Sequence, residues 1–376
     1  MKHILESDHH VGDWLTQHQF PAYRRKQIQR WLFQGRAEGF DDMSDLPKAL
    51  RDQVSENFQI WTTKVVEHQK SADGTEKLLL ELQDGGRIEC VLLREENRRT
   101  ICISSQVGCA MGCVFCASGL DGVDRNLTTG EIVEQMLRLQ RLLPEQERLS
   151  HIVVMGMGEP LANLDRLLPA LDQASSPDGL GISARRITIS TVGLPPAITR
   201  LAKLNSRYHL AVSLHAPNDE LRNEIVPVNS NIGIQKILDA ADHYFEVSSR
   251  RLTFEYVLLA DVNDRPEHAH QLASLLKARN VLLNVIPYNP VAGLPYRTPS
   301  SKAIGNFRAI LLKANINIQF RQRKGDDIDA ACGQLRRKTV KTTELVDIEP
   351  LNWLIAQRTA YLALIFFILI RYHKSC

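Results

Sequence analysis

Residues 100 to 321 alternate between short apolar runs and longer stretches with helical periodicity, and this alternation constrains the fold more than any other feature of the chain. Strands that alternate with helices at this spacing predict βαβ units and a parallel sheet. Six or seven such units predict an α/β fold with a full or partial barrel. The strand-like runs are TICISS (100–105), HIVVMGM (151–157), RITIST (186–191), HLAVSL (209–214), LTFEYVL (252–258), LLNVIP (282–287) and INIQFR (316–321).

The N-terminal part of the chain has a different pattern. Helical patterns at 24–33 and from Leu46 to about Phe58 precede the alternating segments KLLLELQ and RIECVLL, which are typical of a β-ribbon. We predict that residues 1–85 form an N-terminal accessory domain with a β-ribbon linker, and that residues 86–337 form the barrel domain.

The last part, residues 338–376, is predicted to be an extension of unknown role. It contains the apolar segment AYLALIFFILI (360–370), whose eleven residues would reach roughly 16 Å as a helix. A bilayer has a hydrocarbon core of about 30 Å, so we expect no stable membrane insertion. A docked helix or an exposed apolar tail is the expectation.

The composition limits the class of protein. A net charge of +3, from 46 basic and 43 acidic residues, excludes a uniformly basic coat but allows a local basic patch. Seven cysteines in 376 residues are too few for a disulfide scaffold, and the N-terminus lacks the apolar core of a signal peptide. We expect a cytoplasmic protein whose cysteines are thiols or metal ligands.

Polar or reactive residues follow the strand-like runs. Because the carboxyl ends of parallel strands meet at one edge, we expect these residues to lie together there. They include the segment QVGCAMGCVFCASG, Gly158-Glu159-Pro160, Ser190, Thr191, His215, Asn289 and Cys332.

Cys109, Cys113 and Cys116 form a C-x₃-C-x₂-C motif directly after the first strand-like run. Three interpretations are open at this point. Buried thiols would be packing residues, and structural zinc would need a fourth ligand that no second cysteine pair supplies. An iron–sulfur cluster held by three thiolates would leave one iron open to a small chelating molecule.

The motif and its placement resemble the radical S-adenosylmethionine (SAM) superfamily. The resemblance implies a partial (β/α)6-type barrel, a 4Fe-4S cluster on Cys109, Cys113 and Cys116, and SAM chelated to the open iron. Electron transfer to the sulfonium would then produce a 5′-deoxyadenosyl radical. The residues that it implies for SAM binding are Gly158, Glu159, Ser190, Ser213, Leu214, His215 and Asn289.

More of the chain, roughly residues 20 to 337, resembles the RlmN/Cfr family of RNA adenine methyltransferases. The pattern is more similar to the branch that methylates adenine C2 than to the Cfr branch, which methylates C8. The segments that carry the resemblance are ICISSQVGCAMGCVFCASG, GMGEPLAN, ITISTVG, VSLHAPNDELR, IPYNP and GDDIDAACGQLR. Family members usually end soon after the last of these segments, so the extension is a departure from the pattern.

The resemblance also implies roles for three further residues. Cys332 would carry the methyl group as S-methylcysteine, with two SAM molecules used per turnover. The Cys332 thiomethylene radical would add to C2, Glu89 would accept the C2 proton, and Cys102 would resolve the adduct through a transient disulfide with Cys332. An exposed strand carboxylate remains the alternative for Glu89, and a core position the alternative for Cys102. Cys90 and Cys376 have no matching role.

The implied partners are 23S rRNA at the peptidyl-transferase centre, certain tRNAs beside the anticodon, a one-electron reductant and a thiol reductant for the disulfide. We expect a monomer that binds RNA phosphates through local basic patches. The candidate patches are Arg24, Arg25, Lys26 and Arg30, then Arg321, Arg323 and Lys324, and finally Arg336, Arg337 and Lys338.

Three alternatives to C2 methylation stay open on sequence. The first is a Cfr-like adenine-C8 methyltransferase, and the second is a radical SAM enzyme that acts on a protein or a small metabolite. The third is a zinc-containing RNA-binding protein without catalytic activity.

Overall fold

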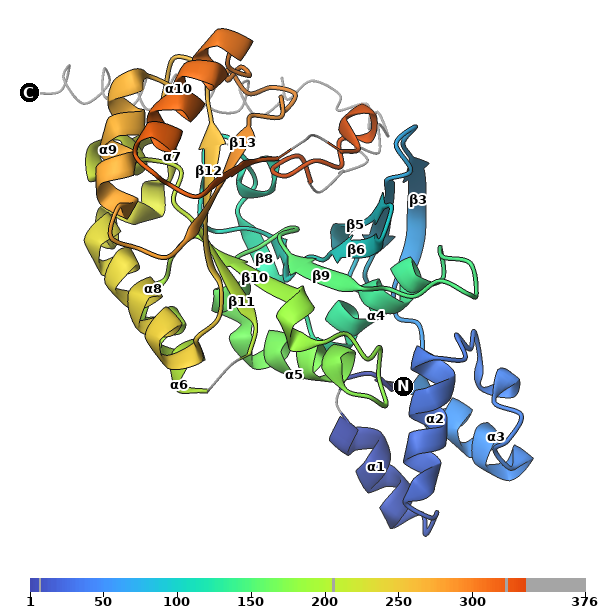
Figure 1. Cartoon of the computed structure of the whole chain (residues 1–376). Coiled ribbons are helices and arrows are strands. Elements are labelled where there is room, and N and C mark those ends of the chain that lie inside the picture. The colour runs from blue at the N-terminus through green and yellow to red at the C-terminus, as the bar shows by residue number, and fades with distance from the viewer. Residues whose placement is uncertain (7, 205–206, 322–323, 336–376) are drawn as a thin grey trace, which may run out of the picture. The chain divides into compact units, whose positions relative to one another are not determined.

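The computed structural model describes residues 1–6, 8–204, 207–321 and 324–335, and these belong to one compact unit (Figure 1). The predicted extension at 338–376 lies outside the described residues, as do Arg323, Arg336, Arg337, Lys338 and Cys376. Within the described part, no helix is both long enough and apolar enough to cross a bilayer.

Seven parallel strands lie next to one another in chain order, and each falls within one of the seven predicted runs or overlaps it. The sheet does not close, because β14 pairs only with β13 while the opposite side continues into antiparallel strands. The prediction of a partial α/β barrel is therefore confirmed. The parallel strands are β6 (Arg98–Cys102), β9 (His151–Val154), β10 (Ile187–Thr191), β11 (His209–Ser213), β12 (Leu252–Leu258), β13 (Leu282–Pro287) and β14 (Ile318–Phe320).

Helices connect these strands and cover the outer face of the sheet (Figure 1). Alternation within a strand sets which side chains face them: in β10, Ile187 and Ile189 are fully buried, whereas Thr188 is half-buried and lines the barrel interior. The helices are α4 (Thr129–Gln140), α5 (Leu164–Ser175), α6 (Pro195–Lys203), α7 (Asp219–Ile225), α8 (Ile234–Ser248), α9 (Pro266–Leu276) and α10 (Ser301–Lys313).

The predicted β-ribbon belongs to the barrel sheet rather than to a linker. Strands β3 (Lys64–Lys70), β4 (Glu76–Glu81) and β5 (Arg87–Glu95) form an antiparallel meander that pairs with β6, with Val91 opposite Cys102. The predicted boundary between residues 85 and 86 thus falls in the turn between two paired strands. A hairpin alone cannot bury an apolar face, so the ribbon extends the larger sheet instead.

The N-terminal helices form a small layer beside the barrel, and their buried side chains belong to the same continuous hydrophobic core (Figure 1). Strand β1 (Lys2–His3) pairs in parallel with β2 (Phe58–Gln59). This pairing joins the N-terminus to the segment that leads into the β-ribbon. The fully buried side chains of Ile28 and Leu50 lie at the positions that helical periodicity predicts. The helices are α1 (Asp8–Gln17), α2 (Tyr23–Phe33) and α3 (Lys48–Asn57).

Candidate active site

The three-cysteine loop lies between β7 (Gln106–Gly108) and β8 (Val123–Asn126), a small antiparallel pair just beyond the carboxyl end of β6. All three thiols are free. Burial raises the pKa of Cys109 to about 12 and raises the pKa of Cys113 and of Cys116 as well, and the Cys116 thiol further raises that of Cys113. Thiolates at such positions need a bound metal to hold them in the charged form.

Among the described residues, no three Cys, His, Asp or Glu side chains converge on one point as the ligands of a single ion would. A cubane cluster makes a different demand, because each thiolate binds a different iron. Three neighbouring free thiols on one loop fit that ligand set.

Gly158 and Glu159 follow β9 and pack against this loop. Gly158 has a φ of +104°, and a Cβ atom there would lie 2.6 Å from the Gln106 side chain, so only glycine fits. The buried Glu159 carboxylate accepts hydrogen bonds from the backbone N–H groups of Leu161 (3.0 Å) and Val192 (2.7 Å). Burial raises the pKa of Glu159 to about 7. The Thr191 side chain adds a third hydrogen bond, so the carboxylate keeps about one acceptor site for a further donor, such as an ammonium group.

Ser190, Ser213 and Asn289 lie at the carboxyl ends of β10, β11 and β13 or directly after them, at the same edge as Glu159. Asn289 donates to the Cys332 carbonyl oxygen (3.2 Å), and within the described part of the chain its own buried Oδ1 has no hydrogen-bond partner. A buried acceptor without a donor is costly, and a hydroxyl or ammonium group of a bound cofactor would relieve that cost.

Leu214 and His215 contribute differently from the serines. The Leu214 side chain is fully buried, its N–H donates to the Glu255 carbonyl oxygen (3.0 Å) and its carbonyl oxygen accepts from Arg222 (2.9 Å), so its backbone polar groups are already hydrogen-bonded. Burial, and secondly the nearby Arg222 guanidinium, lower the pKa of His215 to about 3, so the imidazole is neutral. Its Nδ1 accepts from the Val257 N–H (3.1 Å), and its ring lies edge-on to Phe115. His215 therefore holds the segment after β11 in place through neutral contacts and carries no charge.

Sequence reasoning missed Arg222, which organises this edge. The guanidinium is fully buried and donates to the carbonyl oxygens of Val192, Ser213 and Leu214. It thereby holds the ends of β10 and β11 together behind the three-cysteine loop. A charged residue in an amphipathic helical segment gives no signal of such burial.

The loop that carries Cys332 contacts the three-cysteine loop directly. The Ala117 N–H donates to the Gly333 carbonyl oxygen (2.8 Å), and Ser118 Oγ donates to the Leu335 carbonyl oxygen (2.6 Å). Cys332 itself is exposed, and Arg321 Nη1 lies 3.6 Å from its sulfur. The two hydrogen bonds hold the Cys332 loop next to the three-cysteine loop.

Cys102 and Cys332 line the same cavity, which has a volume of about 630 Å³ and occupies the barrel interior. Cys102 lies on β6 and is partly buried. Burial, and secondly the Cys332 thiol, raise the pKa of Cys102 to about 12. The structure thus brings together two cysteines that are 230 positions apart in the chain.

Glu89 is not the exposed carboxylate that remained its alternative. Its side chain is 1% exposed and forms an ion pair at 3.0 Å with Lys77, which is 2% exposed. Lys77 Nζ also donates to the Asp329 carbonyl oxygen (3.0 Å) in the Cys332 loop. Glu89 is two residues from Val91, the partner of Cys102, so Glu89 and Cys102 share one face of the sheet. Glu89 is not among the residues that line the cavity.

The cavity extends to the opposite edge of the sheet, where the parallel strands begin. A basic rim surrounds it there, with exposed arginines before or at the first residue of successive strands and two half-buried histidines. In the described part of the chain none of these arginines forms an ion pair. The basic rim consists of Arg98, His151, Arg185, Arg186, His209 and Arg251.

The predicted basic patches are less open to a phosphate. Arg30 pairs with Asp45 (2.5 Å), and Arg24 donates to Gln27. Arg321 lies inside the barrel beside Cys332, and Lys324 donates to the Arg94 carbonyl oxygen (3.0 Å). The rim was missed because its members are spread over the sequence in short groups at the starts of different strands.

Comparison with known proteins gives a consistent result. The profile of the Radical SAM superfamily matches residues 103–273, and that of the ribosomal RNA large subunit methyltransferase N-terminal domain matches residues 7–60. A probable dual-specificity RNA methyltransferase RlmN from Rhodopirellula baltica is 67% identical over 336 residues, covering 89% of this chain and 91% of the relative. The Geobacillus kaustophilus protein of the same name is 46% identical over 333 residues, covering 88% and 91%.

A solved structure agrees with these sequence relatives. The crystal structure of a radical SAM methyltransferase from Sphaerobacter thermophilus superimposes with a TM-score of 0.87 at 40% identity. The match covers 89% of this chain and 99% of that chain.

Proposed function

The chain belongs to the RlmN family of radical SAM RNA methyltransferases, and from that premise we propose that it methylates C2 of an adenine. The proposed substrates are 23S rRNA at the peptidyl-transferase centre and the adenine beside the anticodon of some tRNAs. Family membership implies a 4Fe-4S cluster and SAM. The observation that carries the proposal is the placement of Cys102 and Cys332 in one cavity that adjoins the three-cysteine loop.

Adenine C2 lies between two ring nitrogens and is electron-poor, so it does not attack a methyl sulfonium as an amine would. When bound to Cys109, Cys113 and Cys116, the cluster together with SAM supplies a carbon-centred radical for this position. The residues that would hold and orient the cofactor are Gly158, Glu159, Ser190, Ser213, Leu214, His215 and Asn289.

Cys332 is the proposed methyl carrier. Its sulfur is exposed and lies 3.6 Å from Arg321 Nη1, so it is accessible to a methyl donor, and cysteine sulfur is a nucleophile that can take up a methyl group. A second SAM molecule would serve the radical step, giving two per turnover. The hydrogen bonds that the Ala117 N–H and the Ser118 hydroxyl donate to the carrier loop support transfer between the cofactor and that loop.

Cys102 and Glu89 would complete the reaction after the Cys332 thiomethylene carbon has bonded to C2. The radical adduct would return one electron to the one-electron redox couple that supplied it, and Glu89, held in place by Lys77, would accept the C2 proton, so that the ring regains its aromaticity. The Cys102 thiolate would then attack Cys332 Sγ, forming the S–S bond and breaking the S–CH₂ bond. The electron pair of that bond stays on carbon, which takes up a proton to become the methyl group. An external thiol would reduce the disulfide.

RNA would reach the cavity from the basic rim. The three-cysteine loop and the Cys332 loop occupy the opposite edge, and unpaired arginines suit the phosphates that flank a flipped base. A cytoplasmic monomer with an external one-electron donor stays a prediction.

Anaerobic assay of the iron–sulfide-reconstituted protein with SAM, a reductant and either 23S rRNA fragments or tRNA tests the proposal. We expect 2-methyladenosine in the digested nucleosides. 8-Methyladenosine in its place would favour the Cfr-like alternative, and no methylated adenine with either RNA would overturn the proposed function.

A further inference from the structure

A polar pair with unused acceptors lies inside the barrel. Glu255 on β12 and Asn284 on β13 face each other in the sheet register, and Asn284 Nδ2 donates to Glu255 Oε1 (3.0 Å). Glu255 is only 4% exposed. Both its Oε2 and the Asn284 Oδ1 are buried, and neither has a hydrogen-bond partner among the residues that the structure describes.

These two oxygens are expensive to leave unpaired. A buried polar atom without a partner costs about 1–3 kcal/mol, and more when it is charged. The hydrogen bond between the two side chains fixes the Asn284 amide, so that both unused atoms are acceptors. Two adjacent acceptors complement a group that offers two N–H donors, which is the chemistry of an exocyclic amino group.

Glu255 and Asn284 line the cavity that also contains Cys102, Cys332 and the basic rim. Of the side chains assigned to the cofactor, only Asn289 lines this cavity, whereas Glu159, Ser190 and Ser213 do not. An amino group that enters from the basic rim therefore meets the pair on the same path that leads to the two cysteines.

We propose that Glu255 and Asn284 read the exocyclic amino group of the target adenine in RNA. This inference rests on the proposed function and adds a specificity-determining site to it. The amino group and C2 flank N1 on one edge of adenine, so holding the amino group fixes the direction in which C2 points. Guanine and hypoxanthine place a carbonyl oxygen where adenine has its amino group, and that oxygen would meet two acceptors.

The test compares RNA hairpins with adenosine or inosine at the target position. We expect the unmodified enzyme to prefer adenosine by at least about 100-fold in kcat/KM, because sites built for a donor strongly reject analogues that lack it. Glu255→Gln can turn an amide N–H towards the inosine oxygen, so the preference should narrow by at least about tenfold. The quantity compared between enzymes is the ratio of kcat/KM for adenosine RNA to kcat/KM for inosine RNA. A difference in intrinsic reactivity between the two bases affects every enzyme equally and therefore cancels in this comparison.

Glu95→Gln is the matched control, since Glu95 is an exposed carboxylate that lines the same cavity. Its adenosine preference should stay unchanged. Asn284→Ala offers a second variant if Glu255→Gln does not fold, and it should slow methylation of adenosine RNA more than that of inosine RNA.

Two results would overturn the inference. One is an equal loss on both RNAs in Glu255→Gln and in Asn284→Ala, which would mark the pair as structural. The other is a change of more than about tenfold in the SAM dissociation constant with an unchanged base preference, which would assign the pair to the cofactor's adenine. Methylation of adenosine RNA by the unmodified enzyme in either case would show that the proposed function survives.

Discussion

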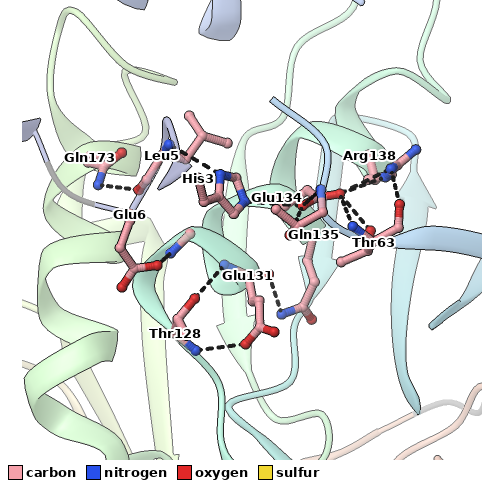
Figure 2. A network of polar contacts seen from close by, with 12 residues as sticks. His3, Leu5, Glu6, Thr63, Thr128, Glu131, Glu134, Gln135, Arg138 and Gln173 are labelled. Atoms are coloured by element: carbon pink, nitrogen blue, oxygen red, sulfur yellow. Dashed lines mark hydrogen bonds and ion pairs between the residues drawn. The ribbon is translucent and has the colours of Figure 1, made fainter. Parts of the chain in front are cut away.

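Two buried glutamates in this molecule are surrounded in opposite ways. Glu134 on α4 accepts from the backbone N–H and side-chain hydroxyl of both Thr62 and Thr63, and Arg138 and His3 add further donors (Figure 2). Glu255 accepts one hydrogen bond, from Asn284, and among the described residues its Oε2 has no hydrogen-bond partner. Both carboxylates are almost completely buried.

The difference separates structural from functional burial. Burial alone would raise the pKa of Glu134, but the hydrogen bonds of His3, Thr63 and Thr62 outweigh it and lower the pKa to about 2. For Glu255, burial is the largest influence and raises the pKa. A carboxylate saturated by its own chain joins elements together, whereas one left unsatisfied in a cavity is suited to a ligand.

The largest effect is expected inside the cavity. Cys332→Ala removes the proposed methyl carrier, so methylation of RNA should fall below detection in nucleoside analysis. Iron content and some SAM cleavage should persist, because the three cluster thiols are untouched. Methylated RNA from this variant would contradict the carrier role, and Cys90→Ala serves as a control at a buried thiol with no proposed role.

Cys102→Ala should block a later step. Without the resolving thiol, the bond between Cys332 and the base is expected to persist as a covalent protein–RNA adduct. Denaturing gels with labelled RNA would detect it, and the double variant Cys102→Ala/Cys332→Ala should show none. Normal product formation without adduct would remove the resolving role.

Glu89→Gln should reduce the methylation rate by about 100-fold or more, which is typical for loss of a general base. The same adduct should accumulate, and mass spectrometry should still find methylated Cys332. Glu81→Gln makes the same charge change on β4, where the carboxylate pairs with Arg87, and should leave the rate unchanged. A rate loss without adduct would indicate a structural role for the Lys77 pair.

Glu134→Gln should lower the free energy of unfolding at pH 7 by about 3 kcal/mol. The reason is that the pKa of Glu134 is about 2 in the folded protein, against an ordinary value of 4.5. The carboxylate stabilises the fold above pH 4.5, and this contribution is lost as the pH falls towards 2. Denaturant unfolding at pH 7 and pH 4 should therefore show a smaller difference between parent and variant at the lower pH. An equal difference at both pH values would show that the charge is not the cause, and the adenosine preference should not change.

The smallest effect is expected at the basic rim. Replacing Arg98, Arg186 and Arg251 together with glutamine should weaken RNA binding roughly tenfold at moderate salt. The slope of log affinity against log salt should fall by about 2, because each single-strand phosphate that an arginine neutralises adds about 0.7 to the slope. The three exposed cations Arg265, Lys302 and Lys313 provide a control with the same charge change. Triple replacement by lysine should keep most of the affinity, and an unchanged slope in the glutamine variant would exclude the rim as the RNA-binding surface.

Local pattern was enough to predict much of the site. The segments with the three cysteines and with Gly158 and Glu159 come soon after strands of the sheet. Predicting where those strands end therefore also predicts that these residues lie at the carboxyl edge of the sheet. Glu255 gave a signal that went unused, a lone carboxylate within the apolar run LTFEYVL. Lys77 gave none, because burial of its ammonium depends on Glu89 from a neighbouring strand and on a carbonyl far along the chain.

By itself, the sequence determined the order of strands and helices, the parallel sheet and the thiol loop at its edge. Those features follow from periodicity and spacing among residues close together in the chain. Only the tertiary structure decided that the ribbon joins the barrel sheet, that Cys102 shares a cavity with Cys332, and that Glu134 is saturated while Glu255 is not. Hydrogen bonding and burial of a side chain depend on which distant strands lie beside it, and no local pattern specifies that register.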